Sequence, residues 1–170
     1  MKRLVTFIIC SVCIFSCSSN KQKNRMKIDN FKIIGISIET TNENQKAVQD
    51  LGMLWGRFFS EDIASKVPNK LGDEIFSLYT DYESDYTGKY TAILGVKVSS
   101  LDSIPEGMIG RTFQGGSYQK FTTKSLEPES VVDVWKEVWA RDKELNRRYT
   151  VDFEVHKQGS KTEVFIAVNP

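Results

Sequence analysis

The sequence predicts one α+β domain in which two strand-helix-strand-strand repeats form an antiparallel sheet. Two observations support this fold class. Apolar and polar residues alternate over several short segments, which is the pattern of strands with one buried face. The order strand, helix, strand, strand also occurs twice, over residues 31–98 and 118–168. Two such units joined edge to edge would place both helices on one face of the sheet and leave the opposite face for a ligand cleft.

The first unit is expected to begin with a strand over Phe31–Thr40, which is rich in isoleucine. A helix is expected from Asn42 to about Ser60, since Asn42 suits a helix N-cap. The apolar residues of this helix recur at helical spacing: Val48, Leu51, Trp55, Phe58 and Phe59. A loop over residues 66–72 precedes strands over 74–80 and 90–98, which the polar segment 81–88 joins as a hairpin.

The second unit follows an irregular stretch over residues 99–116. It is expected to contain a strand over 118–123, a helix over 125–146, and a closing hairpin of strands over 149–156 and 162–168. The helix has acidic residues near its start, basic residues near its end, and Pro128 in its first turn. This arrangement complements the helix dipole and the positional preference of proline.

The composition and motifs of the chain argue against nucleic-acid, metal and cofactor binding. The chain has 170 residues and a net charge of +1, with no strongly basic segment, so it offers no electrostatic footprint for nucleic acid. His156 is the only histidine, and no phosphate loop or nucleophile motif is present. We therefore expect no metal, no cofactor and no nucleic-acid partner.

The N-terminus has the features of an export signal. Lys2 and Arg3 precede an apolar run from Leu4 to Phe15. The following Ser16-Cys17 resembles the lipobox of bacterial lipoproteins, so residues 1–16 are predicted to be a lipoprotein signal peptide and Cys17 to carry lipid. An ordinary secretory signal cut nearby is the alternative. Residues 17–30 would form a flexible tether, holding the domain at the cell membrane or outer membrane, outside the cytoplasm.

Glu154 is the leading candidate for a binding residue. In the strand over 149–156, Asp152, Glu154 and His156 share one face, opposite an apolar face. A carboxylate placed among aromatic residues either binds a cation or amine or takes part in proton chemistry. Burying it costs several kcal/mol unless a cation balances the charge. The alternatives are an exposed strand acid, or an ion-pair partner of Arg147 or Arg148.

Aromatic side chains are the candidates for the apolar walls of the cleft. They are Tyr79, Tyr118, Trp135, Trp139 and Phe165. The tryptophans would otherwise be core residues of their helix, because Trp135 lies on an apolar helical stripe. Contact between such rings and a bound amine contributes about 0.5–2 kcal/mol.

Several segments resemble the GyrI-like effector-binding superfamily, especially its integron-associated branch. The segments that carry the resemblance are Tyr79–Asp85, Tyr90–Val98, Ile104–Met108, Gly116–Thr123, Val134–Trp139, Arg147–Tyr149, Asp152–Val155 and Val164–Val168. The effector-binding domain would span residues 31–169. The superfamily fold consists of two strand-helix-strand-strand units, which agrees with the repeat inferred from the pattern.

The resemblance implies a function and assigns roles. Members of the superfamily bind small organic molecules, often hydrophobic or cationic, in an aromatic cleft that contains a glutamate. Glu154 matches that glutamate by motif position, and Tyr79 matches a facing aromatic residue. His156 stands where tyrosine is frequent, and residues 124–126 lack a usual glycine. The resemblance thus implies a membrane-anchored effector-binding protein. A hydrolase with Glu154 as general base and a protein-binding inhibitor module are the alternatives.

Overall fold

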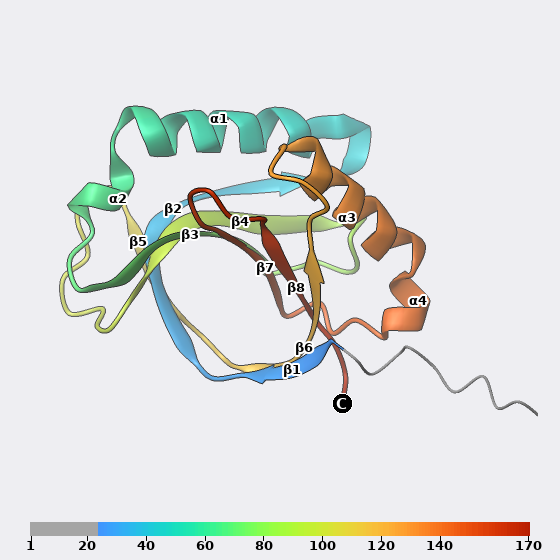
Figure 1. Ribbon diagram of the computed structural model, residues 1–170. Coiled ribbons are helices and arrows are strands. Elements are labelled where there is room, and N and C mark those ends of the chain that lie inside the picture. Colours follow the sequence, from blue (N-terminus) through green and yellow to red (C-terminus); the bar gives the residue numbers. More distant parts are fainter. Residues whose placement is uncertain (1–23) are drawn as a thin grey trace, which may run out of the picture.

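The computed structural model describes residues 24–170. The predicted signal peptide, Cys17 and the start of the tether lie outside these residues. Within them, the strands form one antiparallel sheet in the order β1-β6-β8-β7-β3-β4-β2-β5 (Figure 1). The strands are β1 (Arg25–Ile28), β2 (Phe31–Thr41), β3 (Lys70–Thr80), β4 (Lys89–Val98), β5 (Ile109–Phe113), β6 (Gly116–Thr122), β7 (Val151–His156) and β8 (Glu163–Ala167). The helices are α1 (Lys46–Ser60), α2 (Ile63–Lys66), α3 (Glu129–Ala140) and α4 (Asp142–Leu145).

The sheet is built from two units of the same order. One unit is β2-α1-β3-β4 and the other is β6-α3-β7-β8. The second strand of one unit pairs with the second strand of the other, with Ser77 of β3 opposite Glu154 of β7. Within each unit the last strand lies between the other two, so the units are related by a pseudo-twofold axis between β3 and β7. These features confirm the predicted α+β class, the antiparallel sheet and the repeat.

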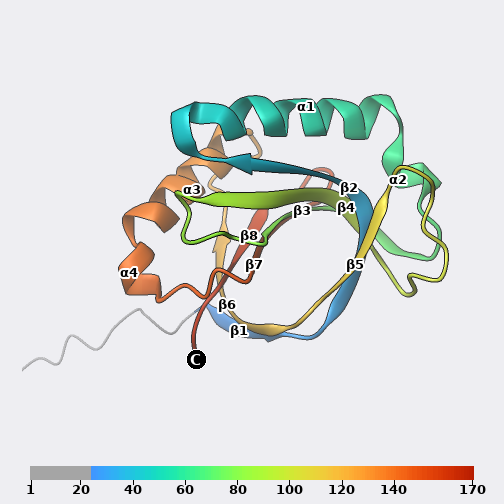
Figure 2. The same cartoon turned by 180° about the vertical axis from the view of Figure 1, so that it is seen from behind.

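The sheet closes on itself. Residues 25–28 pair with β6 and residues 31–35 pair with β5 in one continuous register, with Ile28 opposite Gly116 and Phe31 opposite Phe113. The β1–β2 and β5–β6 segments therefore run side by side and complete a ring with β4, β3, β7 and β8 between them (Figures 1 and 2). Gly115 permits this approach, because a Cβ there would lie 2.0 Å from the carbonyl oxygen of Ile28.

Two short strands were not foreseen in the sequence. Residues 25–28 were assigned to the flexible tether, and residues 109–113 to an irregular stretch, yet they form β1 and β5. Without them, one side of β6 and one side of β2 would present unpaired backbone groups. Residues 25–28 of the predicted tether therefore belong to the sheet.

The ring has two differently filled faces. The helices cover the outer face, where Leu54 and Phe58 of α1 pack on β2 and β4, and Val134 and Val138 of α3 pack with residues of β8. The interior holds an aromatic core centred on Phe153. The strands in Figure 2 surround this core.

The first helix buries a different stripe from the predicted one. It begins at Lys46, after a 3₁₀ turn, and Val48 and Phe59 are 74% and 63% exposed. The buried stripe includes Asp50, whose carboxylate accepts a hydrogen bond from the hydroxyl of Thr40 at 2.6 Å. Val48 and Phe59 lie on the opposite, exposed side of the helix.

Candidate functional site

The outer face of β7 carries two buried carboxylates. Asp152 is 0% exposed and Glu154 is 3% exposed, and both point to the helix-covered side of the sheet. Phe153 and Val155, which alternate with them, face the interior of the ring. Buried carboxylates are rare in proteins unless something compensates their charge, so the partners of each acid show what the site can do.

Glu154 receives hydrogen bonds from three side chains of three elements. Its Oε1 accepts from the hydroxyl of Tyr79 on β3 at 2.9 Å and from the indole Nε1–H of Trp135 on α3 at 2.6 Å. Its Oε2 lies 2.7 Å from Nε2 of His156 on the same strand. The hydroxyl of Ser77 lies 3.0 Å from that of Tyr79 and donates to it. Both carboxylate oxygens are therefore engaged.

The partners on Oε1 are neutral donors. Burial, together with the negative charge of Glu154, raises the pKa of Tyr79 well above its ordinary value, so the phenol keeps its proton and donates it. An indole N–H has no charge to offer either. Among residues 24–170, no lysine or arginine forms an ion pair with Glu154.

Asp152 has a permanent cation. Its Oδ2 lies 2.7 Å from Nη2 of Arg147, and it also accepts from the hydroxyl of Tyr82 at 2.9 Å and from the backbone N–H of Ala167 at 2.7 Å. The Arg147 side chain is completely buried and lies over the ring of Tyr149, 4.3 Å from its centroid. Arg147 thus pairs with Asp152, which excludes the alternative that it is the partner of Glu154.

Aromatic rings surround Glu154 on the helix side. The rings of Tyr79 and Trp135 meet edge to face at 5.1 Å, and Tyr90 meets Tyr79 at 5.9 Å. Trp139 lies 6.3 Å from Trp135 and stacks on Tyr86. The structure therefore brings Glu154, Tyr79, Trp135 and Trp139 into one group beneath α3.

Two of the predicted wall residues lie elsewhere. Tyr118 and Phe165 are buried inside the ring, with their rings 5.4 Å and 4.7 Å from that of Phe153. In the register of β7 and β8, Phe165 is opposite Phe153 and Val164 is opposite Glu154. Cross-strand neighbours share a face, so the sheet separates Phe165 and Tyr118 from the carboxylate. They are core residues.

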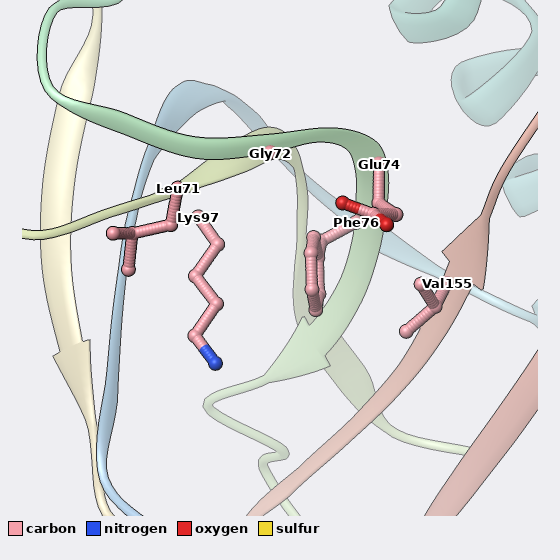
Figure 3. Close-up of a pocket in the computed structure, with 6 residues that line it drawn as sticks. All are labelled: Leu71, Gly72, Glu74, Phe76, Lys97 and Val155. Atoms are coloured by element: carbon pink, nitrogen blue, oxygen red, sulfur yellow. The ribbon is translucent and has the colours of Figure 1, made fainter.

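An open hollow of about 320 Å³ lies on the interior face of the ring, away from the helices (Figure 3). Its lining residues are Leu71, Gly72, Glu74, Phe76, Lys97 and Val155. It forms where β3 bulges: Lys70 is opposite Val98 and Ile75 is opposite Val96, so residues 71–74 have only Lys97 across from them. The hollow lies on the face where the sequence placed the cleft, but none of the predicted site residues lines it.

Two contacts of the site were not predicted from the sequence, that of His156 with Glu154 and that of Trp55 with His156. His156 is a partly exposed strand residue, 24% exposed, and its contact with the carboxylate of Glu154 was not predicted. Its position two residues after Glu154 was the available signal, because such residues share a strand face. Trp55 of α1 meets the imidazole edge to face at 5.1 Å, a contact between distant segments that no local pattern indicates.

Other site types find no support in the part of the chain that the structure describes. Residues 24–170 contain no group of three or more histidine, cysteine, aspartate or glutamate residues that would hold a metal ion. No helix within the same range combines the length and the apolar character needed to cross a membrane.

The chain resembles known proteins along its described length. A family model described as "Integron-associated effector binding protein" (Cass2) matches residues 26–168. YobU of Bacillus subtilis (strain 168), named as a transcriptional regulator, is 27% identical over 145 residues, which are 84% of this chain and 91% of YobU.

Solved structures agree with this match. The integron cassette protein VCH_CASS2, from the mobile metagenome of Vibrio cholerae, is 31% identical with a TM-score of 0.67, covering 86% of this chain and 95% of its own. The structure of SAV2435 bound to tetraphenylphosphonium is 20% identical with a TM-score of 0.71, covering 85% and 92% of the two chains, and shares the fold. The family match supports small-molecule binding. The chain belongs to the family of integron-associated effector binding proteins.

Proposed function

We propose that this protein captures a hydrophobic organic cation, with Glu154 as the counter-ion of the ligand. The observation that carries the proposal is the contrast between the two buried acids of β7. Asp152 has a buried arginine of its own, whereas Glu154 is held by neutral donors and one histidine. A buried carboxylate without a permanent cation is costly, and a cationic ligand would supply the missing charge.

The aromatic group around Glu154 suits such a ligand. Tyr79 and Trp135 would present ring faces or edges to it, and cation–π contacts contribute about 0.5–2 kcal/mol. The indole of Trp135 lies directly beside the carboxylate of Glu154, because its N–H donates to Oε1 at 2.6 Å. Trp135 is only partly buried, so rotation of this side chain would open the carboxylate from the α3 side. Trp139 would then form the outer wall.

The neighbouring structure supplies a suitable probe. Tetraphenylphosphonium is bound in SAV2435, and it combines a permanent positive charge with four aromatic rings. Its binding to this protein is a direct test, measured by isothermal titration calorimetry. We expect binding to the wild type, with affinity controlled by the carboxylate.

Glu154→Gln is expected to weaken binding of tetraphenylphosphonium by about 10- to 100-fold, or about 1.4–2.8 kcal/mol, because the amide removes the buried negative charge that would balance the cation. The amide keeps the shape of the side chain and still accepts hydrogen bonds from Tyr79 and Trp135. Glu163→Gln, a change at a partly exposed acid on the adjacent strand β8, is the matched control and should bind as the wild type does. Equal affinity in Glu154→Gln and the wild type would remove the basis of the proposal.

The proposal includes attachment to a membrane through lipid on Cys17. Its support is the sequence: Lys2 and Arg3, the apolar run that follows, and Ser16-Cys17. We expect Cys17→Ser to move the protein from the membrane fraction to the soluble fraction in its native host, whereas Cys13→Ser should leave it with the membrane. The fractions are compared by immunoblotting. Retention of the Cys17→Ser protein in the membrane fraction would refute lipid attachment at this residue.

A further inference from the structure

His156 is the one imidazole among the side chains that contact Glu154 in the described residues. Its Nε2 lies 2.7 Å from Oε2 of Glu154. Imidazole side chains as a class gain or lose a proton between about pH 5 and pH 8. The other ring nitrogen, Nδ1, lies 3.3 Å from the hydroxyl of Thr162. A hydroxyl both donates and accepts hydrogen bonds, so Thr162 suits the neutral and the protonated ring alike.

The remaining groups that face this pair come from every element packed around it. They are Ser77 and Tyr79 on β3, Tyr90 on β4, Trp55 on α1, Trp135 on α3 and Thr162 before β8. All of these are neutral: burial raises the pKa of Tyr90 to about 12, and Tyr79 is held protonated as described above. The nearby charges are engaged elsewhere, because Asp152 pairs with Arg147 and Lys157 lies 3.7 Å from Glu74.

We propose that His156 is an internal counter-ion that competes with the cationic group of the ligand for Glu154. The inference rests on the proposed function and adds a condition to it. When the imidazole is neutral, the pocket keeps one negative charge and attracts a cation. When the imidazole is protonated, Nε2–H donates a charge-assisted hydrogen bond to Oε2. The pair is then neutral overall, and an arriving cation meets the imidazolium as a like charge.

Under this proposal, capture depends on pH as well as on the chemistry of the ligand. A cation whose own charge does not titrate, such as a quaternary ammonium or phosphonium, is captured at neutral and alkaline pH and released in acid. By linkage, the ligand also acts on the histidine: binding the cation disfavours the imidazolium by the same free energy by which the imidazolium disfavours the cation.

The test compares the affinity for tetraphenylphosphonium at pH 8.0 and pH 5.5 in the wild type, His156→Gln and Glu154→Gln. The wild type should bind about 5- to 100-fold more weakly at pH 5.5, the usual range for coupling between two sites. His156→Gln keeps a polar group at this position but cannot take up the proton, so its affinity should be nearly equal at the two pH values. Glu154→Gln should bind weakly at both.

Each other outcome identifies which idea fails. If the affinities of the wild type and His156→Gln fall equally in acid, protonation of Glu154 itself is responsible and the role of His156 is overturned. If the wild type shows no pH dependence while Glu154→Gln has lost binding, the role of His156 fails and the proposed function stands. If Glu154→Gln binds as well as the wild type, the proposed function fails.

A second measurement needs no variant. His156 is the only histidine of the chain, so one set of imidazole signals reports its titration by NMR. Saturating tetraphenylphosphonium should move the midpoint of that titration to lower pH. An unchanged midpoint in a sample shown to be saturated would refute the competition even if His156→Gln failed to fold.

Discussion

Replacing Arg147 with methionine is expected to lower the free energy of unfolding by about 3–5 kcal/mol, the cost of leaving a buried charge without its partner. The guanidinium of Arg147 lies 2.7 Å from Asp152, and both side chains are 0% exposed. Methionine fills a similar volume but leaves the carboxylate with only the Tyr82 hydroxyl and the Ala167 N–H. Urea denaturation followed by circular dichroism measures the loss.

Two comparisons separate the ion pair from other effects. Arg148→Met changes an exposed neighbour and should alter stability by no more than about 0.5 kcal/mol. The double variant Arg147→Met with Asp152→Asn should be more stable than Arg147→Met alone, because it removes the unpaired charge. If Arg147→Met is as stable as the wild type, the buried pair contributes nothing to the fold.

The stability lost in Arg147→Met should also depend on pH. Burial raises the pKa of Asp152, and the guanidinium opposes that shift. In Arg147→Met the guanidinium is gone, so burial alone acts on Asp152 and raises its pKa further. The folded state therefore binds a proton on Asp152 more tightly than the unfolded chain does. Stability is then retained at low pH and lost as the pH rises through the folded-state pKa. The deficit relative to the wild type is expected to be largest at neutral pH and to shrink in acid.

Phe165→Ala is expected to destabilise the domain by about 3–5 kcal/mol, as large-to-small changes of buried phenylalanine do. Phe165 is 6% exposed and stacks on Phe153 at the centre of the ring interior. The interior face has no contact with the carboxylate of Glu154. In protein that remains folded, the affinity for tetraphenylphosphonium should therefore stay within about threefold of the wild type, a difference below 1 kcal/mol.

The exposed Phe59→Ala is the control for Phe165→Ala. Phe59 lies on α1 and is 63% exposed, so its loss should cost well under the 3 kcal/mol or so that a buried ring does. The opposite pattern for Phe165→Ala, with full stability and lost binding, would place Phe165 in the binding site after all.

Local patterns predicted the architecture but not its closure. The alternation in strands such as β2 and β7 depends on residues close in sequence, so it predicted the sheet and the repeat. β1 and β5 each have five residues or fewer, and their formation depends on partners more than 70 residues away. Such pairings are decided by the whole fold, and a single sequence does not display them.

Long-range strand pairing also explains why the predicted site residues lie on two different faces of the sheet. Alternation within β7 correctly placed Glu154 and Phe153 on opposite faces. Whether Phe165 shares a face with one or the other depends on the register of β7 against β8, and a shift of one residue reverses the answer. The ion pair between Asp152 and Arg147 was not predicted, because nothing local indicated that Arg147 would be buried beside Asp152.

Closure of the strands into a ring also decides where this molecule can deform. The edge strands of an open sheet can separate or shift, but here each edge strand is paired with a neighbouring segment. The aromatic side chains of the interior are closely packed and resist compression. If the ligand binds beside Glu154 as proposed, adaptation to ligands of different size would therefore fall to the covering layer, where loops connect α3 (Glu129–Ala140) to β6 and, through α4, to β7. In the proposed binding mode the barrel would act as a rigid support, and movement of α3 would admit larger ligands.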